Sequence, residues 1–275
     1  MAFGDLTRIG TNLQSMQSLK TLQGTNNELG MRQLRLATGS RLNAAEDDSA
    51  GYSIATKLQS KVRGQAQALS NVGDAKSMLT IAEGGLNTVM EILQTMKEKT
   101  VQAANDTMGS SERTAIDSQL DALSAEITDI LGDSKFNNTS LFTSTAFSFQ
   151  VGEASTDSFS VTVGTVTVDA LAVAAGDIDV SSAANATGLL SSIDAAITTI
   201  SNKLGGIGDS QKRLTFKQDS LGISMNNNEA ARSRIADADF AKEQMEIVKL
   251  QILQQTGTAA VAQANSAPQS VLSLF

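Results

Sequence analysis

Two short acidic groups are the residues best suited, by type and spacing, to carry out chemistry. Glu46-Asp47-Asp48 and Asp237-x-Asp239 each place carboxylates close together, and carboxylate oxygens are the ligands that hard divalent cations prefer. Neither group continues into a calcium-binding loop, so we favour the alternative that these carboxylates face solvent or cap helices. Gly205-Gly206-Ile207-Gly208 lacks the preceding strand and the third glycine of a dinucleotide-binding loop.

Histidine and cysteine do not occur among the 275 residues. Structural zinc sites need one or both of these residue types, and Ser-His or Cys-His nucleophiles need an imidazole. Disulfides and thiol redox switching are excluded as well. The sequence therefore predicts that the protein is not an enzyme, with no catalytic residues, no metal and no cofactor.

The charge of the chain argues against two classes of partner. The sequence has 29 acidic and 21 basic residues, a net charge of −8. Nucleic-acid binding needs a basic surface, and so does docking on anionic lipid. No apolar run approaches the ~20 residues of a membrane span, and the first residues lack the pattern of a secretory signal peptide. We expect no nucleic acid, no membrane insertion and no cleaved leader.

Long helices are predicted by apolar residues whose spacing alternates between four and three, which is the heptad pattern of helices packed side by side. Three such seams lie in the middle of the chain, at residues 68–96, 116–130 and 193–225. Between the second and third, Phe147, Phe149 and Val151 alternate with polar residues, as do Phe159, Val161 and Val163. This alternation predicts a β-hairpin at 147–163, within a β region that extends to about residue 168. The small-residue segment 172–186 that follows is expected to face solvent.

Both ends of the chain carry further apolar stripes. Near the start, a seam through Leu6, Ile9 and Leu13 continues after a three-residue slip through Leu22 and Leu29, which we interpret as a stammer in a coiled coil. Near the end, two stripes run side by side. One contains Val248, Ile252 and Gln255, and the other contains Leu250 and Leu253.

The face formed by the two C-terminal stripes is too broad for one partner helix. One alternative is that both stripes are buried within the same chain. We expect association with other copies instead, because the ends contain too little else to cover this surface. The predicted fold is mainly α: a long antiparallel helical coiled-coil bundle with one small β-hairpin region.

Several motifs resemble bacterial flagellins. The segment from Thr38 to Gly51, TGSRLNAAEDDSAG, is similar to the family's Ser-Gly-x-Arg-Ile-Asn-x-Ala-x-Asp-Asp-Ala-Ala-Gly segment. The run ARSRIADADFA at 231–241 and the run QILQQTG at 251–257 are as close, and the resemblance continues to Leu274. It extends over nearly the whole chain apart from residues 146–190. The centre lacks the large surface domains of many flagellins, so the chain resembles a short form with the two core domains only.

The resemblance implies a structural subunit that self-assembles into the helical, hollow flagellar filament used for swimming motility. Residues 1–40 and 232–275 would form the inner coiled-coil domain, and residues 41–231 the outer helical spoke domain with the hairpin. The subunit would be secreted through type III export and lie outside the cell. Its implied partners are other copies of itself, an export chaperone, the filament cap and hook-filament junction proteins.

The residues expected at the subunit interface come from the terminal seams and from the motifs near the domain boundary. They are Leu6, Ile9, Leu13, Leu22, Leu29, Arg41, Asn43, Asp47, Asp48, Arg232, Arg234, Val248, Leu250, Ile252, Leu253, Gln255, Leu272 and Leu274.

Two alternatives stay open beside the filament subunit. The first is a hook-filament junction protein of the same superfamily. The second is a secreted adhesin or immune-receptor ligand. Flagellins recognised by toll-like receptor 5 carry a Gln-Arg-Val-Arg-Glu-Leu-Ala-Val segment. The corresponding run in this chain is residues 94–101, where Thr95 replaces the first arginine and Lys99 replaces the leucine. We therefore expect weak recognition by that receptor.

Overall fold

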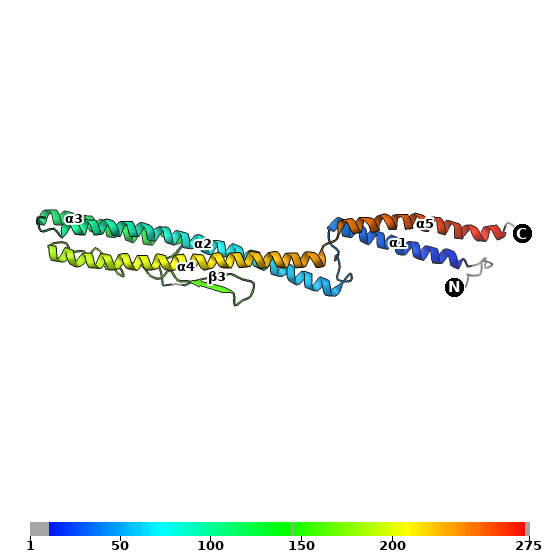
Figure 1. Ribbon diagram of the computed structural model, residues 1–275, viewed down its shortest axis with the longest axis horizontal. Coiled ribbons are helices and arrows are strands. Elements are labelled where there is room, and N and C mark those ends of the chain that lie inside the picture. Colours follow the sequence, from blue (N-terminus) through cyan, green and yellow to red (C-terminus); the bar gives the residue numbers. More distant parts are fainter. Residues whose placement is uncertain (1–10, 145, 273–275) are drawn as a thin grey trace. The chain divides into compact units, whose positions relative to one another are not determined.

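The computed structural model describes residues 11–144 and 146–272. Within these residues there are five helices and two two-stranded antiparallel sheets. Their order along the chain, coloured in sequence in Figure 1, is α1 (Leu13–Thr38), α2 (Ser49–Ala103), α3 (Ser110–Asp133), β1 (Lys135–Phe136), β2 (Thr139–Ser140), β3 (Phe147–Gln150), β4 (Ser158–Val161), α4 (Ala183–Ala236) and α5 (Phe240–Leu272). The predicted fold class, mainly helical with a small β region between the long helices, is confirmed.

Two compact units divide the chain. Unit 1 combines the chain up to Ser60 with the chain from Asn227 onward, and unit 2 comprises Lys61–Asn226. The domain boundaries expected from the sequence were 40/41 and 231/232. The unit boundaries fall elsewhere because α2 and α4 each contribute residues to both units. That the two units are the inner and spoke domains of a filament stays a prediction.

The core of unit 2 follows the predicted heptad seams. In α2, every seam position from Ala68 to Met96 is buried, and in α4 the residues at seven-residue steps from Ile193 to Leu221 are buried. Polar pairs show that α2 and α4 run antiparallel. Near one end of the pair, Gln65 Nε2 donates to Ser224 Oγ at 2.9 Å. Near the other, Lys97 Nζ lies 2.6 Å from Asp194 Oδ1.

The helix α3 buries a heptad seam with one polar member. Ile116, Leu120, Ile127 and Leu131 are buried in steps of four and seven, and Ser124 occupies the core position between them. Its hydroxyl donates to the carbonyl of Val173 at 2.7 Å. This bond satisfies the buried hydroxyl and ties the segment after the hairpin to α3.

The predicted hairpin is present as β3 paired with β4, with Phe147 opposite Val161. The guanidinium of Arg213 lies over the ring of Phe159, 4.7 Å from its centroid, so a cation–π contact joins this hairpin to α4. A second, smaller hairpin, β1 with β2, is additional to the one expected. Its two-residue turn consists of Asn137 and Asn138, both with positive φ (47° and 63°). Asparagine tolerates this conformation, which a tight hairpin turn requires.

The segment 172–186 is expected to face solvent, and this expectation is wrong for four of its residues. Val173, Ile178, Val180 and Ala186 are buried in the core of unit 2, as is Leu171 just before the segment. The exposed residues of the segment are Ala172, Ala175, Gly176, Asp177, Asp179, Ser181, Ala184 and Asn185. The residues Leu171 and Val173, and then Ile178 and Val180, are spaced two apart, so each pair turns the same side of an irregular segment toward the core.

Across residues 11–144 and 146–272, the longest helices all fall short of the apolar run that crossing a membrane would require.

Candidate subunit interface

Helices α1 and α5 pair in an antiparallel arrangement within unit 1, and they lie side by side in Figure 1. At the start of α1, Asn12 Nδ2 donates to the carbonyl of Ala264 at 2.7 Å. Further along, Gln254 Nε2 donates to Asn26 Oδ1 at 2.8 Å. As the residue number rises in α1, that of its partner in α5 falls, which fixes the antiparallel direction.

The inward-facing positions of this pair form two continuous heptad series. In α5 the least exposed positions alternate between steps of four and three, and they are Glu243, Ile247, Leu250, Gln254, Gly257, Val261 and Ala264. In α1 half-buried positions follow the same rule, and they are Ser15, Ser18, Leu22, Thr25, Leu29, Arg32 and Leu36, with Arg35 half-buried beside the last of them. The stammer expected in α1 is therefore wrong. The slip between the two apolar seams is a change of face, from the outward side at Leu13 to the inward side at Leu22.

An ion pair lies within this seam. Arg32 Nη1 donates to both carboxylate oxygens of Glu243, at 2.9 and 3.0 Å, and the Glu243 side chain is buried. Close to the middle of the pair, a Cβ on Gly257 would lie 3.2 Å from Leu22 Cδ1. The glycine therefore allows the two helices to approach closely at that level.

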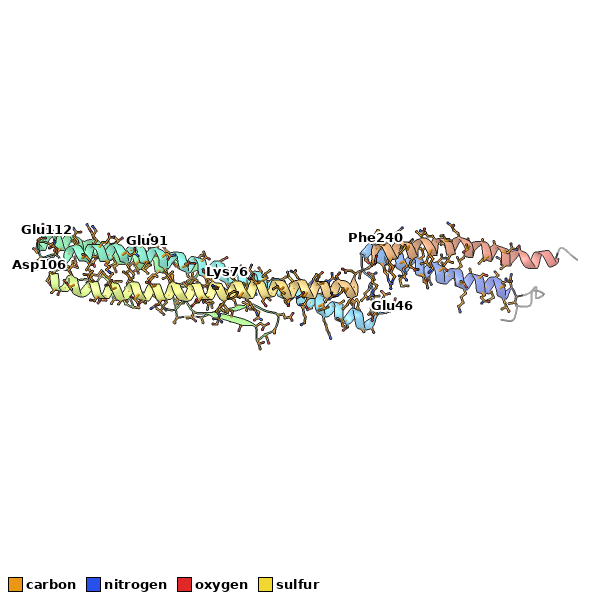
Figure 2. The ribbon with its side chains drawn as sticks, viewed as in Figure 1. Glu46, Lys76, Glu91, Asp106, Glu112 and Phe240 are labelled. Atoms are coloured by element: carbon orange, nitrogen blue, oxygen red, sulfur yellow. The ribbon has the colours of Figure 1, made fainter. Side chains whose placement is uncertain are left out.

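A second set of apolar side chains on the same two helices is exposed, and we call it the outer apolar face. On α1 and α5 its members are Leu13, Met16, Leu19, Met31, Leu34, Met245, Val248, Ile252 and Leu253. Phe240, labelled at the start of α5 in Figure 2, is also exposed. Exposed apolar stripes of this kind, here one on each helix, mark interaction surfaces in a soluble protein.

The sequence-predicted interface residues of the terminal helices divide between these two surfaces. Leu22, Leu29 and Leu250 lie in the seam between α1 and α5, whereas Leu13, Val248, Ile252 and Leu253 lie on the outer apolar face, and Gln255 is exposed as well. Leu6, Ile9 and Leu274 lie outside the described residues, and so does the side chain of Leu272 at the end of α5.

The predicted residues near the domain boundary form a joint between two connections of unit 1. Helix α1 ends at Thr38 and is capped by the following Gly39, which has φ +69° and the left-handed conformation of a helix cap. Directly after it, Arg41 donates its backbone N–H to the carbonyl of Ala236 at 2.7 Å and its Nη2 to the carbonyl of Ile235 at 2.7 Å. In return, Ala238 N–H donates to the carbonyl of Gly39 at 2.9 Å. The connection from α1 to α2 is thereby fixed against the connection from α4 to α5.

Asp47 closes the first of these connections. Its carboxylate accepts the backbone N–H groups of Asn43 and Ala44 at 3.0 and 3.2 Å, and Arg35 Nη2 at 3.3 Å. These hydrogen bonds, that from the Asn43 backbone foremost, lower the pKa of Asp47 below its ordinary value of 3.8. The neighbouring Asp48 accepts the N–H of Gly51 at 3.0 Å and is the N-cap of α2.

The second connection is held in a similar way. Arg232 Nη2 lies 2.7 Å from Glu229 Oε1, and its Nη1 lies 3.8 Å from Asp237 Oδ1. The hydrogen bond between Arg232 and Glu229 raises the pKa of the arginine and lowers that of the glutamate. Asp239 caps α5 by accepting the N–H groups at 241 and 242, and Arg234 is exposed.

The acidic groups weighed at first as cation sites are thus used within the protein. Asp48 and Asp239 cap helices, the Asp47 carboxylate accepts hydrogen bonds from the protein, and Asp237 pairs with Arg232. Glu46 is exposed in the connection between α1 and α2 (Figure 2). Among the residues that the structure describes, histidine, cysteine and acidic side chains nowhere gather in a group of three that could hold a metal ion.

Sequence reasoning missed the polar members of the α1–α5 seam, among them Arg32, Glu243 and Gln254. An uninterrupted four-three alternation through Glu243, Ile247, Leu250 and Gln254 is the signal that could have identified them. This alternation is hard to recognise in the sequence because polar residues occupy half of these positions.

Comparison with known proteins covers most of the chain. Residues 9–146 match the model of the bacterial flagellin N-terminal helical region, and residues 190–275 match that of the bacterial flagellin C-terminal helical region. A flagellin of Halalkalibacterium halodurans is 34% identical over 97% of this chain and 99% of its own length. A flagellin of Bacillus subtilis is 32% identical over 98% and 99%, respectively. A structure of a flagellar hook-associated protein from Vibrio parahaemolyticus has a similar fold, with a TM-score of 0.61 and 15% identity over 70% of this chain and all of that one.

Proposed function

The chain belongs to the bacterial flagellin family, and we propose that it is a structural subunit that self-assembles into the helical, hollow filament of the bacterial flagellum. Similarity to flagellins over almost the full length of both chains supports this role. As a member of a family of structural proteins, the chain contributes to swimming through assembly and not through catalysis. Its proposed location is the extracellular filament.

The observation that carries the proposal is the outer apolar face of unit 1. The inward side of α1 and α5 is covered within the chain, whereas Met245, Val248 and Ile252 are exposed at steps of three and four on α5. Covering such a stripe contributes roughly 25 cal/mol for each Å² of apolar surface removed from water. Repeated copies of the same chain, each presenting this face, would cover it in the filament.

In this proposal the expected interface residues take two roles. Leu13, Val248, Ile252 and Leu253 would contact neighbouring subunits directly. Leu22, Leu29 and Leu250 would hold α1 and α5 together so that the face has a defined shape. The joint at Arg41, Asn43, Asp47, Asp48 and Arg232 would fix the two connections, and Arg234, exposed beside it, would be free to reach a neighbouring subunit.

The filament role is favoured over the alternatives. The likeness to a hook-associated protein is one of fold alone, at 15% identity, whereas the flagellin relatives match along the whole chain. We further propose that an export chaperone, the filament cap and junction proteins bind this chain. Recognition by toll-like receptor 5 would be weak, because Thr95 and Lys99 replace residues of the recognised segment.

The test is seeded polymerisation of the purified full-length chain, followed by sedimentation and electron microscopy. The unmodified chain is expected to extend filament seeds. Ile252→Asp is expected to abolish extension, because it places a carboxylate where an apolar contact would form. Gln251→Asp is the matched control: it adds the same charge at the exposed neighbouring residue without removing an apolar side chain.

Failure of the unmodified chain to extend seeds would overturn the proposed function. Equal loss of extension in both variants would show that added charge, and not loss of an apolar contact, is responsible. The importance assigned to the outer apolar face would then be wrong.

A further inference from the structure

The methionines of the described residues differ in exposure according to the unit in which they lie. In unit 1, Met16, Met31 and Met245 are 62%, 41% and 67% exposed. In unit 2, Met78 and Met96 are fully buried. The three remaining described methionines, which are half-buried in unit 2, are Met90, Met108 and Met225.

All three exposed methionines belong to the outer apolar face. Met16 lies three residues from both Leu13 and Leu19, and Met245 lies three residues before Val248, so each shares a helix face with exposed aliphatic neighbours. Met31 lies three residues before Leu34, which is exposed as well. Three flexible thioethers are therefore distributed along a surface otherwise made of aliphatic side chains.

An exposed thioether is open to oxidation by a peroxide. One oxygen atom passes from hydrogen peroxide to the methionine sulfur, the O–O bond breaks, an S–O bond forms and water leaves. The sulfur is oxidised from thioether to sulfoxide and the peroxide is reduced. Access of the oxidant to the sulfur governs the rate, so the three exposed residues should react before the buried ones.

We infer that Met16, Met31 and Met245 are oxidation-sensitive positions that control whether the free chain can join the filament. The inference rests on the proposed function, because the outer apolar face must be the surface that other copies cover. A sulfoxide replaces an apolar side chain with a polar, chiral one, and burying it without a hydrogen-bond partner opposes assembly. Oxidation is reversible by methionine sulfoxide reductases, so the block would be reversible too.

The three methionine sulfurs would be accessible to peroxide in the free chain and covered by neighbouring subunits in the filament. Peroxide should therefore act before assembly and have little effect afterwards. The experiment treats the full-length free chain and preassembled filaments with the same series of hydrogen peroxide concentrations. Peptide mass spectrometry measures the sulfoxide fraction at each methionine, and sedimentation after seeding measures the concentration of free chain left at equilibrium.

In the free chain we expect oxidation at Met16, Met31 and Met245 before Met78 and Met96. After this oxidation, the concentration of unassembled chain at equilibrium should rise roughly tenfold or more. A tenfold rise corresponds to a loss of about 1.4 kcal/mol in the free energy of assembly. Filaments should protect the same three residues. Treating the oxidised chain with reductases for both sulfoxide epimers should restore assembly.

Two variants separate oxidation at these positions from general oxidation damage. Met16→Leu/Met31→Leu/Met245→Leu keeps apolar side chains without sulfur and should assemble after peroxide treatment. Met90→Leu/Met108→Leu/Met225→Leu, the matched control in unit 2, should stay as sensitive as the unmodified chain. If the first variant does not assemble even untreated, the reductase experiment on the unmodified chain decides, and failure of rescue overturns the inference.

Normal assembly of a chain shown to carry all three sulfoxides would overturn the inference and leave the proposed function intact. An untreated, unmodified chain that does not extend seeds would overturn the proposed function and the inference together.

Discussion

Leu250 and Ile252 are only two residues apart on α5, yet alanine at each position should have different effects on the free chain. Leu250 is 4% exposed in the seam against α1, whereas Ile252 is 56% exposed on the outer apolar face. Leucine-to-alanine changes at buried sites cost about 2–5 kcal/mol. The lower end applies here, since a seam between two helices can close partly around the gap, so we expect about 2 kcal/mol. Ile252→Ala removes a side chain already largely in water and should cost less than about 1 kcal/mol.

The assay is amide hydrogen exchange of the full-length free chain, resolved by peptide. Because local opening free energies govern exchange, a loss of about 2 kcal/mol should speed exchange roughly 30-fold in peptides from α1 and α5. For Ile252→Ala the increase should stay below about fivefold. Peptides from α3 and from the unit 2 parts of α2 and α4 provide an internal control, since their core does not involve either residue. Global unfolding is a poorer measure, because two compact units need not unfold together.

Comparable acceleration in the two variants, or none in Leu250→Ala, would refute the assigned register of α5. Acceleration confined to α5, with α1 unchanged, would refute the pairing of the two helices in the free chain.

Three further predictions concern unit 1 and the irregular segment of unit 2. Arg32→Ala leaves the buried carboxylate of Glu243 without its partner and should destabilise the α1–α5 pair by about 3 kcal/mol. Replacement of both residues by leucine should destabilise the pair less, and hydrogen exchange of the two variants measures the difference. Because the pKa of Asp47 is lowered in the folded state, its carboxylate stabilises the fold at pH values above 3.8, and this contribution is lost as the pH falls through the folded-state pKa. Limited proteolysis of the 40–48 connection should therefore increase as the pH is lowered below 3.8. Asp47→Asn should remove this pH dependence of proteolysis. A Gly-Ser-Gly insertion after Gly176 should leave the thermal unfolding midpoint of unit 2 nearly unchanged, because added length in an exposed loop costs little closure entropy. The same insertion after the buried Val180 should lower that midpoint.

The core of unit 2 could be predicted because its seams are chemically uniform. Every heptad position of α2 from Ala68 to Met96 is apolar, so period and burial coincide. The same reasoning failed in unit 1 because the inward positions are mixed. Arg32 and Glu243 neutralise each other in the seam, and Gly257 contributes close approach instead of apolar surface. The more apolar stripe, with Met245, Val248 and Ile252, is the one that faces outward.

The joint between the two connections could be predicted only in part. The acidic groups were identified, and their capping role was the favoured alternative. The specific partners depend on the approach of segments nearly two hundred residues apart, such as Arg41 to Ala236, and no local pattern encodes that approach. The turn at Asn137 and Asn138 is the opposite case, since its positive φ angles are a local preference of asparagine.

The pairing of α1 with α5 also sets an order of events during synthesis. Asn12 and Ala264, which are hydrogen-bonded to each other, are separated by 252 positions along the chain. When a ribosome makes the protein, α1 emerges first and its partner last, with the whole of unit 2 between them. Unit 2 can therefore complete its core co-translationally, while α1 has to wait for the final helix. Once unit 2 has folded, the hydrogen bond from Gln65 to Ser224 joins α2 to α4, so the flexible loop left to close between α1 and α5 is much shorter than their separation in sequence, and closing it costs less entropy. A chain truncated before α5 would thus hold a folded unit 2 and an α1 whose inward and outward faces are both exposed to water.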